Sequence, residues 1–491
     1  MMLCLFRSFT VFLVFTLAAC ASLPDITTNE AHSQLVITNV TAIDAINGVR
    51  KNVDILIDGE QISALGQGLS ASAKSSAKRI DGTGKYLIPG LWDAHVHLAY
   101  HPDIGHEVFF PLSLAHGITY LRDTGGHLDK LAEARAISDS DAIAPDLYVS
   151  GPLVDGKKRV YAGQTAGTPD LSVGVANEAQ AIAQVDKLAA QGVDFVKAYE
   201  MLSPAALKAV ITRAKHHKLP VTGHSPLSMT VRQSIEAGMT DMQHLRNLEM
   251  DCAADPDGLL AERQAIIAAN KEEFGGGLRS SLHRLQREKA VAAKDETVCN
   301  ELIALMKQKG VSQTPTLVIS RFLSRQLYAD KRFQDTFALM PKPIVESWME
   351  RANRLAKREP TARDIAFDDW LMGMVAALDR EGVSILAGTD APIGFLTPGA
   401  SLHEELAMLV EAGLTPLEVI GSATIEPAVF LGIQDQQGTI EPARKADLVM
   451  LSADPLVDIA NVSAIDAVIK SGRYLDKQAL DELRERPSKI D

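Results

Sequence analysis

Basic residues are in short supply in this 491-residue chain, which carries 49 Lys and Arg against 62 Asp and Glu. The formal net charge is −13 at pH 7, and it becomes −14 when residues 1–19, whose one charge is Arg7, are removed. An acidic surface repels phosphate groups, so nucleic acid and anionic lipid headgroups are poor candidates for partners. The apolar content of 46% is high enough for a large buried core, which excludes a disordered chain.

The chain also lacks a long apolar run at its start. Residues 8–19 are uncharged and mostly apolar, but a helix that spans a bilayer needs about 20 residues. A basic residue before a short apolar run predicts a cleaved signal segment over residues 1–19. The Leu-Ala-Ala-Cys string that ends at Cys20 resembles the lipobox of bacterial lipoproteins. It implies lipidation of Cys20, a tether over residues 20–34, and anchoring to the outer membrane in the periplasm. An ordinary secretory signal is the alternative.

Cysteine is scarce, with four residues in the whole chain. Cys4 would leave with the signal segment and Cys20 would carry lipid, so Cys252 and Cys299 would remain in an oxidising compartment. An even number of cysteines left in an exported protein favours a disulfide between Cys252 and Cys299 over two free buried thiols.

Two strand-rich regions lie at the ends of the chain. Residues 35–89 and 436–482 alternate short apolar runs with turn signals such as Asn47-Gly48. Chain ends commonly lie close together in a domain. We therefore expect one small β-sandwich domain built from both ends.

The region between them, residues 90–435, alternates strand and helix patterns and shows no other internal repeat. Helices are predicted over residues 178–191, with Asn177 as N-cap, and over residues 204–217. This rhythm predicts an α/β fold, a (β/α)8 TIM barrel, with helical insertions at about 250–310 and 321–380. The eight predicted strands are residues 86–95, 118–124, 146–152, 194–200, 219–224, 239–245, 314–320 and 383–390.

Several of these predicted strands end in a residue that can bind metal. In a TIM barrel the active site lies at the carboxyl ends of the strands, so these side chains should converge. Two histidines separated by one residue on a strand leave the same face, and histidine with a carboxylate suits zinc. The six candidates are His95, His97, Lys197, His224, His244 and Asp390.

These motifs together resemble the amidohydrolase superfamily, and the resemblance extends to the return into the β domain at residues 438–455. It implies that His95, His97 and Asp390 bind one divalent metal ion and that His224 and His244 bind a second. Lys197 would bridge both ions as a carbamate, which a protonated lysine could not do. A Lys197 that is merely ion-paired inside the barrel is the alternative.

The same resemblance implies a reaction. A hydroxide shared by two metal ions, expected to be zinc, would attack a carbonyl carbon. Asp390 would act as general base and then as general acid toward the departing amine.

Three further residues are candidates for binding the substrate. Tyr199 and Arg246 each stand two positions after a candidate ligand, so they should point toward the same site. Arg122 ends the second predicted strand. An arginine and a tyrosine hydroxyl would hold a carboxylate by charge-assisted hydrogen bonds. Structural ion pairs, for example of Arg122 with Asp123, are the alternative.

The short strings around Lys197 and residues 314–317 are most similar to imidazolonepropionase-related amidohydrolases that include Xaa-Pro dipeptidases. This subgroup implies hydrolysis of a dipeptide or an N-acyl amino acid, and the signal segment implies that the hydrolase is exported. Lactone, carbamate or cyclic amide hydrolysis at the same metal centre is an alternative, and so is a non-catalytic binding lipoprotein. A homo-oligomer whose insertion loops are supplied across subunits is left open.

Overall fold

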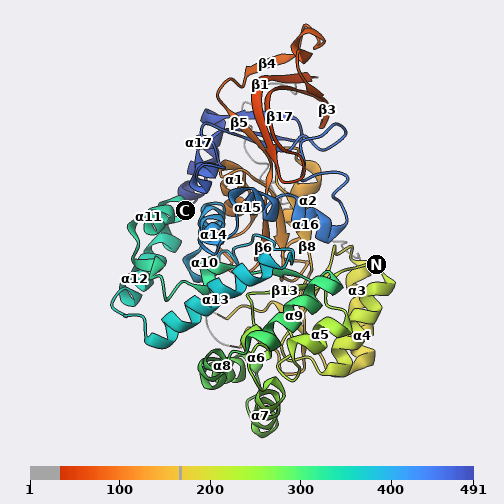
Figure 1. Ribbon diagram of the computed structural model, residues 1–491, viewed down its shortest axis with the longest axis vertical. Coiled ribbons are helices and arrows are strands. Elements are labelled where there is room, and N and C mark those ends of the chain that lie inside the picture. The colour runs from red at the N-terminus through yellow and green to blue at the C-terminus, as the bar shows by residue number, and fades with distance from the viewer. Residues whose placement is uncertain (1–33, 165–167, 491) are drawn as a thin grey trace, which may run out of the picture.

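A computed structural model describes residues 34–164 and 168–490 of the chain (Figure 1). The predicted signal segment, Cys20 and nearly all of the predicted tether lie outside these residues. Among the described helices, none combines the length and apolar character needed to cross a membrane.

One sheet is assembled from both ends of the chain, as the sequence predicts. Its eight strands follow the order β17-β16-β15-β5-β1-β2-β3, with β4 paired to β1. The two ends meet where β15 runs antiparallel to β5. Side chains from both ends, such as Leu35 and Leu448, share one buried apolar cluster. The strands are β1 Gln34–Asp44, β2 Gly48–Asp58, β3 Gln61–Gly66, β4 Lys78–Asp81, β5 Tyr86–Pro89, β15 Leu448–Leu451, β16 Ile465–Lys470 and β17 Arg473–Asp476.

The middle of the chain forms parallel strands in the order expected for a TIM barrel. One sheet is β6-β7-β8, and a second contains β9, β11, β12, β13 and β14 in sequence order, with β10 at its edge. The chain passes from β8 to β9 within a few residues and so connects the two sheets. These strands are β6 Leu91–Val96, β7 Ile118–Asp123, β8 Asp146–Val149, β9 Leu153–Gly156, β10 Ser172–Val175, β11 Val196–Ala198, β12 Val221–Gly223, β13 Asp241–Gln243 and β14 Ser312–Thr314.

The last two predicted strands differ from the structure. The seventh strand is β14, and most of the predicted 314–320 segment is helix α10 instead. Pro315 lacks an N–H for a sheet, and Thr316 has a φ of 48°, so the strand stops there. The eighth segment is irregular. The carbonyl of Ser384 in this segment accepts a hydrogen bond from β14. The N–H of Asp390 donates to the carbonyl of His95 in β6.

The helices cover the parallel strands and fill the two long insertions. Asn177 caps α3 as predicted, by accepting a hydrogen bond from the N–H of Gln180. The helices are α1 His106–Ala115, α2 Ala132–Ser140, α3 Glu178–Ala190, α4 Pro204–His216, α5 Val231–Ala237, α6 Leu248–Asp251, α7 Pro256–Ala269, α8 Gly275–Ala292, α9 Glu296–Lys309, α10 Leu317–Ser320, α11 Lys331–Asp335, α12 Lys342–Leu355, α13 Ala362–Arg380, α14 Ala400–Glu411, α15 Pro416–Ser422, α16 Ile425–Leu431 and α17 Lys477–Glu485.

The first insertion lies at the end of the molecule opposite the β domain. In Figure 1 the strands of the β domain, such as β1 and β17, stand at the top, and α7 and α8 stand at the bottom. Cys252, at the end of α6, and Cys299, in α9, form the disulfide expected from the sequence, with an S–S distance of 2.11 Å. The disulfide therefore ties both ends of the segment that carries α7 and α8.

Candidate active site

The six candidate ligands come from five places in the barrel; five of them line one cavity, and His95 is fully buried next to Asp390. His95 lies in β6 and Lys197 in β11, while His97, His224 and His244 follow the ends of β6, β12 and β13. The cavity has a volume of about 160 Å³. Its lining residues are His97, Leu153, Tyr161, Leu171, Lys197, Tyr199, His224, His244, Arg246, Arg279, Ile319, Asp390 and Ile393.

Distances show how closely the ligands converge. Oδ1 of Asp390 is 3.2 Å from Nε2 of His95 and 3.1 Å from Nε2 of His97. One donor atom each from His95, His244 and Asp390 lie within 4.8 Å of one another. The ring centroids of His224 and His244 are 4.9 Å apart. The structure thus brings both halves of the expected ligand set to a single point.

Hydrogen bonds orient three of these histidines. Nδ1 of His97 donates to the carbonyl of Gly125 at 3.1 Å, because a carbonyl can only accept. Nδ1 of His244 is 2.6 Å from the hydroxyl of Thr316, which itself donates to a backbone carbonyl and so accepts from the ring. Nδ1 of His224 is bonded to Glu200 at 2.7 Å. His224 and His244 therefore keep Nε2 for a metal ion, as metal-binding histidines usually do. Nε2 of His97 lies 3.1 Å from Oδ1 of Asp390 and 3.5 Å from the hydroxyl of Thr124.

Unpartnered polar atoms test whether these residues suit a metal. Both ring nitrogens of His95, Nε2 of His224 and Oδ1 of Asp390 are buried and have no hydrogen-bond partner. A buried polar atom without a partner is destabilising by about 1–3 kcal/mol. A divalent cation bound to one ring nitrogen of His95, to Nε2 of His224 or to Oδ1 of Asp390 would remove that penalty for the atom it binds, so the residues fit a metal site.

Charge states at the site also suit a cation. Burial lowers the pKa of His95, His224 and His244 well below the usual value, which leaves neutral rings with free lone pairs. Burial alone would raise the pKa of Asp390, but its interactions with His244 and His95 outweigh that effect and hold the pKa well below its ordinary value. The carboxylate is therefore ionised.

Lys197 is 1% exposed, and its amine donates a hydrogen bond to Oε1 of Gln243. Burial lowers the pKa of Lys197 to about 7, which is far below that of a free lysine. In a large fraction of the molecules, Lys197 is thus an uncharged amine at neutral pH.

Two of the ligands have a strained backbone. His244 has a φ of 60° and Asp390 a φ of 71°, both in the left-handed region that non-glycine residues rarely adopt. The N–H of His244 donates to the carbonyl of Thr314 at 2.8 Å, and that of Asp390 donates to the carbonyl of His95 at 2.7 Å. Strain of this kind is typical of functional sites.

Two of the three predicted substrate-binding residues line the cavity. Tyr199 and Arg246 do so, whereas Arg122 does not. Arg122 is completely buried inside the barrel, where its guanidinium donates to Asp241 at 3.0 Å and to the hydroxyl of Thr314 at 3.1 Å. The sequence-based role of Arg122 in the site is therefore wrong. Its partner is Asp241 rather than Asp123, because its side chain points across the barrel interior.

Other residues at the cavity were not predicted. Glu200 directly follows Tyr199 and is buried, with its carboxylate bonded to His224. The sequence signal was an acidic residue at the end of the apolar run that carries Lys197. Tyr161 and Arg279 also line the cavity. Arg279 comes from α8 in the first insertion, where no periodicity or motif distinguishes it from the other arginines of that helix.

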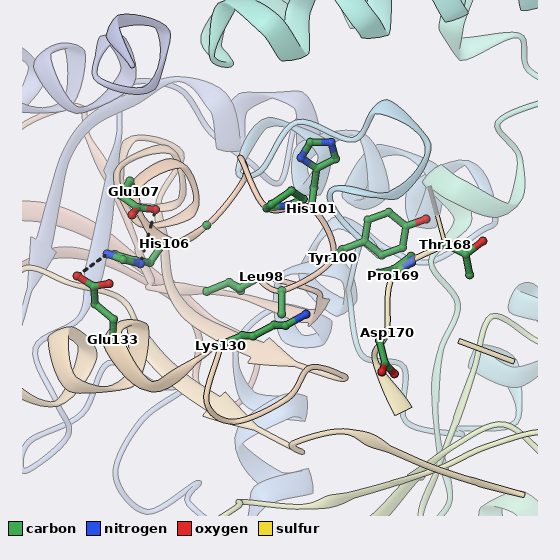
Figure 2. A pocket seen from close by; sticks show the side chains of 13 residues that line it. Leu98, Tyr100, His101, His106, Glu107, Lys130, Glu133, Thr168, Pro169 and Asp170 are labelled. Atoms are coloured by element: carbon green, nitrogen blue, oxygen red, sulfur yellow. Dashed lines mark ion pairs between the residues drawn. The ribbon is translucent and has the colours of Figure 1, made fainter. Parts of the chain in front are cut away.

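A larger pocket of about 700 Å³ lies beside the loop after β6 (Figure 2). None of the six candidate ligands lines it. His106 there forms ion pairs with Glu107 at 3.6 Å and with Glu133 at 4.0 Å. Tyr100 lines this pocket and also packs with Tyr161 against the buried cluster that contains Tyr199. The larger pocket is thus a neighbour of the ligand cavity, and the chemistry belongs to the smaller one.

Comparisons with known proteins agree with this geometry. The family model described as "Amidohydrolase family" matches residues 86–475. The chain is 25% identical to an ochratoxinase of Aspergillus niger over 79% of this chain and 75% of that one. It is 24% identical to an imidazolonepropionase of Fusobacterium nucleatum over 89% and 94%.

A solved structure of a Xaa-Pro dipeptidase with bound methionine superimposes with a TM-score of 0.64 at 19% identity, over 90% of this chain and 100% of that one. A likeness at this identity shows the fold, and the family model covers most of the chain. The chain belongs to the amidohydrolase family, whose members are hydrolases that act on carbon–nitrogen bonds, including amides and peptides.

Proposed function

We propose that this chain hydrolyses an amide or peptide bond next to a free carboxylate, with two divalent metal ions in the cavity. The observation that carries the proposal is the convergence of buried, unpartnered histidine nitrogens and an ionised aspartate on one point. A dipeptide of the Xaa-Pro kind or an N-acyl amino acid is the proposed substrate. The superimposed Xaa-Pro dipeptidase and the ochratoxinase support this class of bond.

The ligands divide into two groups. His95, His97 and Asp390 would hold one ion, and His224 and His244 the other, with Lys197 between them as a carbamate. The low pKa of Lys197 supports this modification, because the uncharged amine is the form that adds to carbon dioxide. We propose zinc, since imidazole nitrogens dominate the donor set. When bound, two such ions lower the pKa of water and polarise a carbonyl oxygen.

The residues of the chain itself perform the remaining steps. Asp390 is ionised, so its carboxylate can take a proton from the attacking water and deliver it to the amine that departs. Arg246 and Tyr199 line the same cavity and would bind the carboxylate of the substrate. With the carboxylate held there, the scissile carbonyl is positioned beside Asp390.

A substrate screen tests the proposal. The zinc-loaded mature chain would be assayed against Xaa-Pro dipeptides, N-acetyl amino acids, lactones and carbamates. We expect turnover of dipeptides or N-acetyl amino acids that carry a free carboxylate. Activity confined to lactones or carbamates would contradict the amide assignment, and a chain that binds these compounds without turning any of them over would be a binding protein.

We also propose that the mature chain is exported and anchored through lipid on Cys20. The Cys252–Cys299 disulfide supports export, because such bonds persist in oxidising compartments. Expression in a bacterial host followed by membrane fractionation and mass spectrometry of the N-terminal peptide tests this. We expect a lipid-modified Cys20 in the membrane fraction for the natural chain and soluble periplasmic protein for Cys20→Ala. An unmodified cytoplasmic chain would refute export.

A further inference from the structure

Arg279 brings a second guanidinium into the ligand cavity from outside the barrel. It lies near the start of α8, and it is the cavity-lining residue contributed by residues 250–310. The side chains of Arg279 and Arg246 are 19% and 22% exposed, so both still reach open space. The first insertion therefore supplies part of the wall of the site.

Both arginines face the same buried carboxylate. Glu200 is fully buried, with Oε1 at 3.4 Å from Nε of Arg246 and Oε2 at 3.8 Å from Nε of Arg279. Oε1 also bonds to Nδ1 of His224. Two guanidinium groups against one carboxylate leave one positive charge in excess at this end of the cavity. Nε of Arg246 and Oε2 of Glu200 are buried without a hydrogen-bond partner, so this network is incomplete as it stands.

Arg279 is also tied to the aromatic side of the cavity. Its Nη1 donates to the hydroxyl of Tyr199 at 3.4 Å, and its guanidinium lies 5.4 Å from the centre of the Tyr161 ring. The contact with Glu200 and the two aromatic contacts restrict where this long side chain can go. A restricted guanidinium loses less conformational freedom when it binds an anion than a mobile one does.

We propose that Arg279 is a specificity-determining residue that makes a free carboxylate on the substrate obligatory. Its guanidinium would join Arg246 and the Tyr199 hydroxyl around that carboxylate and cancel the excess positive charge. The substrate class is then an N-acyl amino acid or dipeptide whose scissile amide is followed by a single C-terminal residue. C-terminal amides and esters are disfavoured because they leave the positive charge unpaired. This inference rests on the proposed function and deepens it.

Binding of a pair of ligands that cannot be hydrolysed tests the role of Arg279 separately from turnover. In 4-oxopentanoate a methylene group replaces the amide nitrogen of N-acetylglycine, and 4-oxopentanamide has the same shape without the charge. Calorimetric titration of the zinc-loaded chain would give the affinity for each. The variants are Arg279→Gln, Arg279→Lys and, as a control on the same helix, Arg284→Gln, whose guanidinium is exposed and bonds only to Ser281 among the interactions described.

We expect the natural chain to bind the carboxylate at least about tenfold more tightly than the carboxamide, as charge-assisted hydrogen bonds allow. Arg279→Gln should remove most of this preference, Arg279→Lys should keep part of it, and Arg284→Gln should leave it unchanged. An unaltered preference in Arg279→Gln would overturn the inference; if that variant does not fold, an unaltered preference in Arg279→Lys would do so.

Hydrolysis separates this inference from the proposed function. With N-acetyl-L-alanine and N-acetyl-L-alaninamide, Arg279→Gln should raise KM for the acid about 10- to 100-fold with little change in kcat, because the lost contact is made in the ground state as well. If no amide is hydrolysed by the natural chain but the ligand preference depends on Arg279, the proposed function fails and the carboxylate site stands.

Discussion

At the scale of single residues, Asp390 is the side chain on which the proposed chemistry depends most. It is 8% exposed, ionised, and within 3.2 Å of two histidine nitrogens. Asp390→Asn keeps the shape and a ligating oxygen but cannot take up a proton. We expect kcat to fall by at least about 100-fold, the scale of general acid–base catalysis, with metal content retained. Near-natural turnover in the metal-loaded variant would show that Asp390 has another role.

Arg122, unlike Asp390, is a buried charge that stabilises the fold. Removing one partner of a buried ion pair typically destabilises a protein by about 3–5 kcal/mol. We therefore expect Arg122→Leu to lower the free energy of unfolding by this amount, since Asp241 would be left as an isolated buried charge. Urea denaturation measures the loss.

The double variant Arg122→Leu/Asp241→Asn is the matched comparison for that measurement. It should lose less stability than Arg122→Leu, because the isolated charge is gone. If Arg122→Leu raised KM and left the free energy of unfolding unchanged, Arg122 would be a substrate-binding residue instead.

At the scale of elements, the sequence predicts the ligand-bearing strands well because each carries a short apolar run followed by a polar residue. Lys197 in β11 and His224 after β12 are examples. The two misplaced strands follow the long insertions. In the seventh, Pro315 and the left-handed Thr316 break the extended chain, an effect of local geometry that the hydrophobic pattern does not report.

Residues of the insertions were beyond sequence reasoning for a different reason. Arg279 looks like any other arginine on an amphipathic helix, and its role depends on where α8 packs. Glu200 lay within reach of sequence reasoning, because it stands beside Tyr199 in an apolar strand end. The direction of the Arg122 side chain is set by partners far away in the sequence, Asp241 and Thr314, which the sequence around Arg122 does not reveal.

The Cys252–Cys299 disulfide should stabilise the first insertion. Loss of a natural disulfide typically destabilises a protein by about 2–5 kcal/mol. We expect a reducing agent to lower the Tm of the natural chain and to increase proteolysis within residues 252–299. The Cys252→Ser/Cys299→Ser variant is the control, because its Tm should not respond to the reducing agent. Equal responses of the two proteins would contradict a stabilising disulfide.

At the scale of the whole molecule, stability should fall in mild acid because of a buried histidine pair. His116, at the end of α1, donates from Nδ1 to the carbonyl of Leu112, and His403, in α14, donates from Nε2 to the carbonyl of His116. Burial lowers the pKa of His116 to about 3 and that of His403 to about 4. Both rings are therefore neutral in the folded chain.

The unfolded chain takes up these protons first, as pH falls below about 6.5, so folding loses stability between about pH 6.5 and pH 4. His116→Asn/His403→Gln keeps both donors and removes both titrations. We expect its Tm to fall less steeply than that of the natural chain over this range. Parallel Tm curves would show that this pair contributes nothing to the acid response.

Metal content is the measurement that decides whether the cavity holds two metal ions. The mature chain would be stripped of metal, reconstituted with zinc and bicarbonate, and measured by elemental analysis beside Lys197→Ala. We expect about two zinc ions per chain for the natural protein and fewer for the variant, because the proposed carbamate on Lys197 would hold both ions. A natural chain that retains no zinc after reconstitution would contradict the two-metal site.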